Sequence, residues 1–355
     1  MATSPSKLSR AVTRRNNANS PNLSPASSAI NQLQSKLSSG INSVLGLQKD
    51  KKQEATGLRD IPITKGGMST KTMTDQELVQ SVDLFHAIQM DRLDLLERYM
   101  NIKGDTVLFT RKYGSVGPTL IQWAYLYKKF EIGRYLLSFA PERALDIVNS
   151  PVFYGENILH MAIVHGQADE VKYLCQLKGS AGGPSLKGGD VVEFNDSTNG
   201  ASASASALGK QMLAQAATGD FFKRGSSYYF GELPLFFAVA TNQVNLISTI
   251  LSTYDTTEEK VQALIQCNQF GDNLLHICVF KQLVECYMYI IHLVFDLTKV
   301  KVSNGNISVF NENIEYHLLF KTFAHRINMD GRSPLTLAAE LGYSDMFDAI
   351  MSTWR

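Results

Sequence analysis

Cysteine, tryptophan and long apolar runs are all scarce in this chain of 355 residues. It has four cysteines and two tryptophans. No two cysteines form a C-x-x-C pair, and so few in so long a chain exclude a disulfide scaffold. The longest apolar runs, 233–240 and 287–295, fall well short of the roughly 18 to 20 residues of a membrane-spanning helix. Residues 1–30 lack the apolar segment of a secretory signal. We therefore expect a soluble body with reduced cysteines.

The motifs of common enzyme classes are also missing. There is no G-x-x-x-x-G-K-[ST] phosphate loop and no G-x-S-x-G nucleophile turn. His160 and His165 lie close together, but no acid stands between them as a zinc protease helix requires. Glu258 and Glu259 follow two threonines, which indicates the start of a helix rather than a catalytic pair. We expect no enzyme activity, no catalytic residue, no metal and no cofactor.

Charge is unevenly distributed along the chain. The formal net charge is +1, yet residues 1–71 carry eleven Lys or Arg against three acids, and the remainder has a net charge of −7. Residues 1–74 are rich in Ser and Asn and lack a sustained apolar period, which predicts a disordered basic tail. A solvated tail, a transit peptide and a segment that contacts anionic lipid all remain open. The acidic body argues against nucleic acid as a partner.

From Asp75 onward, six segments share one apolar template. Each has a leading Leu or Ile, a small residue three positions on, and paired apolar residues further along. A repeat of this kind predicts stacked supersecondary units, each too apolar to stand alone. The segments are 84–100, 120–137, 158–175, 233–251, 273–291 and 333–351.

The template is that of an ankyrin repeat, which predicts an all-α solenoid of six helix pairs over residues 75–355. Pro234 and Pro334 occupy the first helical position, where a fixed φ is favourable. His160 and His276 are expected to bond the backbone of a neighbouring turn. Gly166 and Gly342 fall where the first helix ends, a position that favours a left-handed residue. We interpret these six residues as structural parts of the repeat.

Two insertions lengthen the array. The Gly/Ser/Ala-rich stretch 178–210 predicts a linker that does not pack. Asn304-Gly305 within 300–319 is typical of a two-residue hairpin turn. The sequence therefore predicts long finger loops between some of the pairs.

The stretch 217–247, ATGDFFKRGSSYYFGELPLFFAVATNQVNLI, resembles a finger and fourth repeat of vanilloid-type transient receptor potential (TRP) cation channels. In that family a G-D/N-F-F run, an aromatic-Tyr-Phe-Gly-Glu-x-P-L run and an N-Q helix end follow in this order. Residues 154–166 and 331–342 resemble its third and sixth repeats. The variants at 118–126 and 154–166 look more like invertebrate sensory members.

This resemblance implies the cytosolic ankyrin-repeat portion of a calcium-permeable channel, acting in subunit assembly and in the regulation of gating. The implied partners are other channel subunits in a homo- or hetero-tetramer, with calmodulin or anionic lipid as further candidates. The implied location is the cytosolic face of the plasma membrane or cilium. Pro118 and Trp123 replace lysines that contact nucleotide in some vertebrate members, so we expect little or no ATP binding at these positions; whether nucleotide binds in another way stays open. The chain has no pore segment, which leaves a soluble ankyrin adaptor, or a truncated regulator of full-length subunits, as the alternative.

Seven finger residues are candidates for a protein contact, because five aromatic and two cationic side chains gather between helical repeats. A subunit contact and packing of the aromatics against the finger's own neighbours both remain open. The candidates are Phe221, Phe222, Lys223, Arg224, Tyr228, Tyr229 and Phe230.

Overall fold

The computed structural model describes residues 74–112, 117–147, 155–179, 208–219, 222–226, 229–299 and 321–353. Within these ranges the regular elements are α-helices and short 3₁₀-helices, without a β-strand, so the expected all-α class is confirmed. None of these helices combines the length and apolar character needed to cross a bilayer. The helices with described bounds are α2 (Asp75–Ser81), α3 (Leu84–Gln89), α4 (Leu93–Lys103), η1 (Gly104–Phe109), α5 (Leu120–Leu126), α6 (Phe130–Phe139), η2 (Pro141–Leu145), α7 (Ile158–Val164), α8 (Ala168–Cys175), α9 (Leu208–Ala214), α10 (Pro234–Ala240), α11 (Val244–Leu251), α12 (Thr257–Ile265), α13 (Leu274–Lys281), α14 (Val284–Lys299), α16 (Pro334–Glu340) and α17 (Ser344–Ser352).

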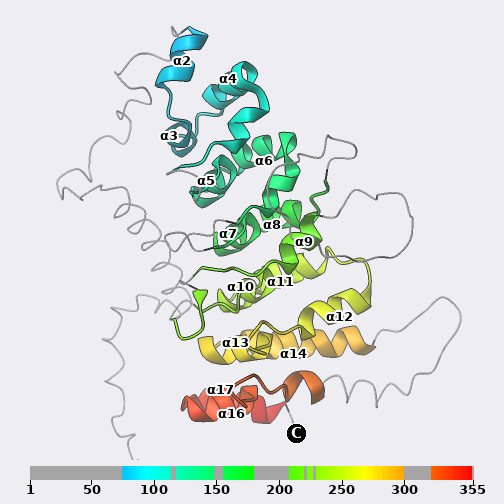
Figure 1. Ribbon diagram of the computed structural model, residues 1–355. Helices are drawn as coiled ribbons and strands as arrows, with labels where there is room; N and C mark the ends of the chain where they lie inside the picture. The colour runs from blue at the N-terminus through cyan, green and yellow to red at the C-terminus, as the bar shows by residue number, and fades with distance from the viewer. Residues whose placement is uncertain are drawn as a thin grey trace, which may run out of the picture.

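The helices are arranged as successive pairs along one axis, from α2 at the top of Figure 1 to α17 at the bottom. Each of the six template segments forms one pair. The first helices pack on one another in the order α3, α5, α7, α10, α13 and α16. Among the second helices, α8 packs on α11 and α14 on α17. Because neighbours in the chain are neighbours in space, one apolar core extends along the stack from α3 to α17.

Every first helix ends in the same turn. After α7, the Gly166 N–H donates to the Ile163 carbonyl at 2.9 Å and the Gln167 N–H donates to the Ala162 carbonyl at 3.3 Å. This pair of bonds defines a Schellman cap, whose turn residue is left-handed. All six caps repeat it with φ between 55° and 72°, although only two of the turn residues are glycine. The turn residues are Asp91, Lys128, Gly166, Asn242, Gln282 and Gly342.

A histidine joins one pair to the next at two places. Nε2 of His160 lies 2.9 Å from the carbonyl oxygen of Glu232, and Nε2 of His276 lies 2.9 Å from that of Arg332. Burial lowers the pKa of His160 to about 4, so its imidazole is neutral. A carbonyl can only accept, hence Nε2 carries the proton and donates it. The asparagine three residues earlier in each case caps the same helix.

Two helices lie outside the repeat template. The start of α12 confirms the prediction from Glu258 and Glu259, because Thr256 and Glu259 form a capping box. The sequence predicted a linker that does not pack up to residue 210, but residues 208–210 belong to the helix α9. Leu208 is buried, and a Cβ on Gly209 would lie 1.9 Å from the Cys175 carbonyl oxygen, so this end packs closely on α8. The Gly/Ser/Ala-rich composition overestimated the length of the linker, because Gly and Ala also allow helices to pack closely.

Several expectations fall outside the described residues. These are the disordered tail up to residue 73, the middle of the linker at 180–207 and the hairpin at Asn304-Gly305. The helix α2 begins at Asp75 behind a Thr74 cap, at the boundary that the sequence proposed between tail and body.

Candidate interaction surface

Three of the seven finger candidates lie in the core. Phe222, Tyr229 and Phe230 are only 3%, 3% and 1% exposed. The ring centroids of Phe222 and Phe230 lie 4.7 and 5.3 Å from that of Phe237 in α10. Of the two alternatives left open by the sequence, packing against the finger's own neighbours therefore holds for these three rings, and they are not exposed contact residues.

The four other candidates are divided. Phe221 and Tyr228 lie outside the described residues, Lys223 is exposed, and the Arg224 side chain is mostly buried. The sequence could not separate these cases, since aromatic side chains serve cores and interfaces equally well.

Arg224 and Tyr229 meet at a buried acid that sequence analysis missed. Asp272 is fully buried, and its carboxylate accepts bonds from the Tyr229 hydroxyl at 2.7 Å and from Arg224 at 3.3 Å. Arg224 also pairs with Asp330 at 2.9 Å. Burial, together with the nearby Asp272, raises the pKa of Tyr229, so the hydroxyl keeps its proton and donates. A buried carboxylate is tolerated here because several donors surround it.

Two turns of identical form complete the network. In each, an asparagine side-chain oxygen accepts two backbone N–H groups and a glycine takes a left-handed φ, at Asn268 with Gly271 and at Asn328 with Gly331. Nδ2 of Asn328 donates to Asp272 at 2.7 Å. The Met329 N–H donates to the Phe270 carbonyl at 2.9 Å, which ties one turn directly to the other.

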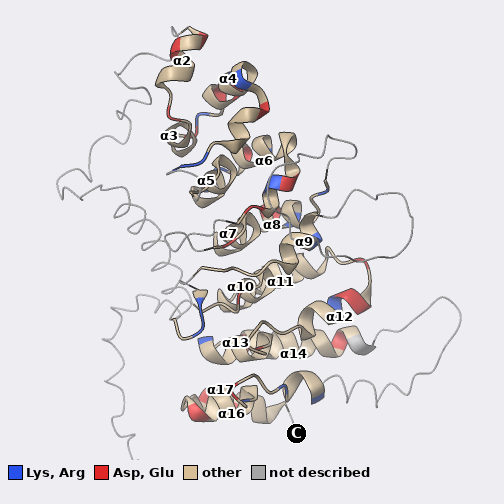
Figure 2. Cartoon of the chain, viewed as in Figure 1, with Lys and Arg blue, Asp and Glu red and all other residues tan. Residues whose placement is uncertain are grey.

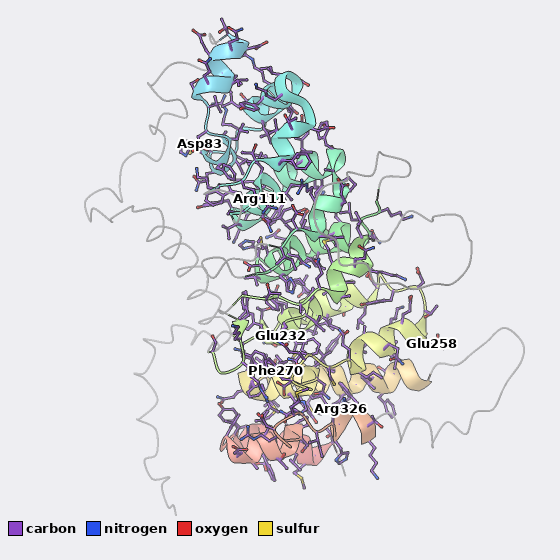
Figure 3. The ribbon with its side chains drawn as sticks, in the orientation of Figure 1. Asp83, Arg111, Glu232, Glu258, Phe270 and Arg326 are labelled. Carbon is purple, nitrogen blue, oxygen red and sulfur yellow. The ribbon has the colours of Figure 1, made fainter. Side chains whose placement is uncertain are left out.

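We call residues 229–232, 268–272 and 326–332 the turn ridge. Figure 3 labels Glu232, Phe270 and Arg326 at three successive levels of the stack, one from each connection. The bonds between the turns fix their relative positions, so an exposed side chain on the ridge is held on a rigid support.

The turn ridge carries the most exposed large apolar side chains of the described residues. Met329 is 76% and Ile327 is 61% exposed, and Arg326 beside them is also exposed. Other exposed apolar residues reach at most 50%, at Phe109, and come from separate parts of the stack. Figure 2 shows that Lys and Arg positions and Asp and Glu positions are spread along the ribbon of the described residues. Exposed apolar side chains on a rigid, polar-bonded support are suited to docking.

A sequence signal for the ridge existed. The pattern Asn-x-x-Gly occurs at 268–271 and again at 328–331. Each copy lies at the same distance before a first helix, α13 or α16. Each copy combines a side-chain turn with a left-handed glycine, a combination typical of a fixed turn. Asn268, Asp272 and Asn328 could have been singled out in this way.

The described residues offer little reactive chemistry. They contain no group of three His, Cys, Asp or Glu side chains arranged to hold a metal ion. The four cysteines are free thiols, with Cys175, Cys278 and Cys286 buried. Burial raises the pKa of Cys175 to about 12 and that of Cys278 well above its usual value, which keeps both as unreactive thiols.

No known protein family matches the chain, and no curated protein matches it. Among solved structures it is similar to a chain from a complex described as the predatory endopeptidase Bd0816 from Bdellovibrio bacteriovorus with the immunity protein Bd3460. The identity is 15% and the TM-score 0.46, over 76% of this chain and 96% of the other. A likeness this distant transfers no activity from either protein of that complex.

These comparisons correct the expected identity. The resemblance to vanilloid-type TRP channels is wrong: neither a family model nor a curated protein of that kind matches the chain. The calcium transport, gating, sensory and ciliary functions that depended on it are withdrawn with it. The residues behind the resemblance have other roles here. Trp123, for example, is a core residue whose Nε1 donates to the Phe85 carbonyl at 3.0 Å.

Proposed function

We propose that this chain is an ankyrin-type helical-repeat protein whose turn ridge binds a segment of another protein. The observation that carries the proposal is the regularity of the stack. Six helix pairs share one cap, with bonds from the turn to the same two carbonyl positions each time. Two of the joints between pairs use the same Asn-x-x-His arrangement. Regular stacks of this kind are used in nature chiefly as binding scaffolds.

The choice of surface rests on exposure and rigidity. Ile327 and Met329 protrude from turns that are bonded to each other and to the buried Asp272. Binding there would order few additional groups, which lowers the entropic cost of association. The partner chemistry that fits is an apolar side chain over Ile327 and Met329, followed by a carboxylate for Arg326.

The test is a selection of displayed 16-residue random peptides against the full chain. We expect enriched peptides to combine aromatic or aliphatic residues with acids. Their affinity should fall at least tenfold in the double variant Ile327→Asp, Met329→Asp, because a buried unpaired charge costs more than about 1.4 kcal/mol.

The matched control is Ile102→Asp, at an exposed apolar residue on α4 that is far along the stack. It should leave binding unchanged. Peptides that bind both variants equally well, or a selection that enriches nothing, would refute binding at the turn ridge.

A further inference from the structure

A small cavity lies where three helix pairs meet the finger. Its volume is about 20 Å³, and its wall includes Leu126 of α5, Phe237 of α10 and Phe222 of the finger. Glu156 and His165, at the two ends of α7, complete the part of the wall that matters here. This volume has room for about one water molecule. The cavity therefore suits water and protons rather than an organic ligand.

Two polar atoms on the wall have no partner among the described residues. Glu156 is 7% exposed, and its Oε2 accepts and donates no hydrogen bond. Nδ1 of His165 is also buried and also has no hydrogen-bond partner. Buried polar atoms in native proteins nearly always bond to protein or to ordered water. A water molecule in the cavity is the available partner for both atoms.

No charged group acts on Glu156. Burial raises its pKa to about 8, against a smaller opposing effect of its own backbone N–H. Burial first, and Lys128 second, lower the pKa of His165 to about 4, while the carbonyls of Leu126 and Tyr125 oppose this. At neutral pH both groups are therefore uncharged.

The ionisable groups His160 and Arg224, which lie near the cavity, bond to partners other than Glu156. Nε2 of His160 bonds to the Glu232 carbonyl, and Arg224 of the finger pairs with Asp272 and Asp330. The α10 segment PLFFAVA contains no ionisable side chain, and Lys223 points to an exposed position. Lys128 acts on His165 but not on Glu156, so no charged group of the described residues offsets the burial of the Glu156 carboxyl.

We propose that the proton on Glu156 controls the position of Phe222: while the acid is neutral the ring stays packed over the cavity and its single water, and ionisation draws in further water and displaces the ring. The step is a simple loss of a proton to solvent. Phe222 is the movable wall because it belongs to a short finger turn, whereas Leu126 and Phe237 are fixed in helices. This device goes beyond partner binding, and its test needs no partner.

The test measures hydrogen exchange of the finger in the full chain between pH 6.5 and 9.5, with rates corrected for the intrinsic effect of pH. The reporter is the Phe222 amide, which donates to the Gly219 carbonyl at 3.1 Å. We expect protection to fall by up to tenfold per pH unit as the pH rises toward about 8 and to level off above it, because opening tracks the ionised fraction of Glu156, which saturates above its pKa.

Glu156→Gln is the decisive variant, since it keeps the shape but cannot ionise. Its protection should stay flat across the range. The matched control is Glu142→Gln, at an exposed glutamate, which should behave like the wild type. The same pH dependence in Glu156→Gln and wild type overturns the proposal.

A second measurement covers failure of Glu156→Gln to fold. Carboxyl ¹³C NMR of the wild type should show one glutamate that titrates near pH 8, with the same midpoint as the loss of Phe222 protection. If every glutamate titrates near its usual pH, or if the two midpoints differ, the proposal is rejected.

Discussion

The same short motif, Gly-acid-Asn-x-x-His, occurs twice in the stack with opposite electrostatic outcomes. In the third pair it places Glu156 before Asn157, and in the fifth it places Asp272 before Asn273. Both acids are buried. Asp272 is met by Arg224, Tyr229 and Asn328, whereas Glu156 Oε2 has no partner among the described residues. The repeat fixes where an acid is buried, and the chain outside the repeat decides whether it is paired.

The largest expected contrast comes from neutralising each acid with its isosteric amide. Asp272→Asn should lower the free energy of unfolding by about 3 kcal/mol, because Arg224, Tyr229 and Asn328 all donate to this buried carboxylate and an amide cannot accept all three bonds. Glu156→Gln removes no ion pair and should not lower stability at pH 7. Urea unfolding of both variants at one pH measures the difference, and equal losses would contradict the comparison.

The pH dependence of stability should sharpen the same comparison. The folded-state pKa of Glu156 is raised to about 8, so its contribution is fully present below the unfolded pKa of about 4.3 and is lost as pH rises through 8. The lowered pKa values of His160 and His165, both about 4, act oppositely: their contribution is present above about 6.5 and is lost as pH falls through 4.

Two histidines outweigh one acid on the acid side, so stability should be highest near pH 6.5. Between pH 5 and pH 8 the free energy of unfolding of the wild type should fall by more than about 1.4 kcal/mol relative to that of Glu156→Gln, since the pKa shift of Glu156 exceeds one unit. Urea midpoints measured from pH 5 to 9 would test this. A wild-type curve parallel to that of Glu156→Gln would be inconsistent with a neutral buried acid.

The smallest expected difference in stability concerns the turns that end α7 and α13, the two helices that follow the Gly-acid-Asn-x-x-His motif. Gly166 ends α7 with φ of 72°, and Gln282 ends α13 with φ of 55°. Gln282→Gly should stabilise by about 1 kcal/mol, because a side chain in the left-handed region is strained. Gly166→Ala should destabilise by a similar amount, and its Cβ would lie 3.0 Å from Gln243 Oε1. Thermal unfolding of the two variants should shift in opposite directions.

Much of the local structure could be predicted from the sequence. The six template segments each form a helix pair, and the acids after Thr256 mark a helix start as expected. These features depend on apolar spacing and on capping residues within a few positions, which are local in the chain. The family assignment failed for the same reason. Apolar spacing and left-handed turns, which dominate 154–166 and 331–342, are requirements of stacked helix pairs in general and do not identify one family.

The site could be predicted only in part. Arg224 and Tyr229 were singled out from their finger, but their meeting with Asp272, more than forty positions later, was not. Phe222 was a candidate contact residue with core packing left open, and it is a core residue because its ring packs against Phe237 of α10. No local pattern encodes which distant groups will face each other.

The sequence alone indicated an all-α chain with six similar helix pairs, and it located two of the six turns, at Gly166 and Gly342. Periodicity and capping act over one or two helical turns, so the order of residues suffices for them. Only the tertiary structure decided that Asp272 is paired and Glu156 is left with a water-sized cavity. Pairing requires side chains from different connections to converge within about 3 Å, and that distance is set by how the pairs stack.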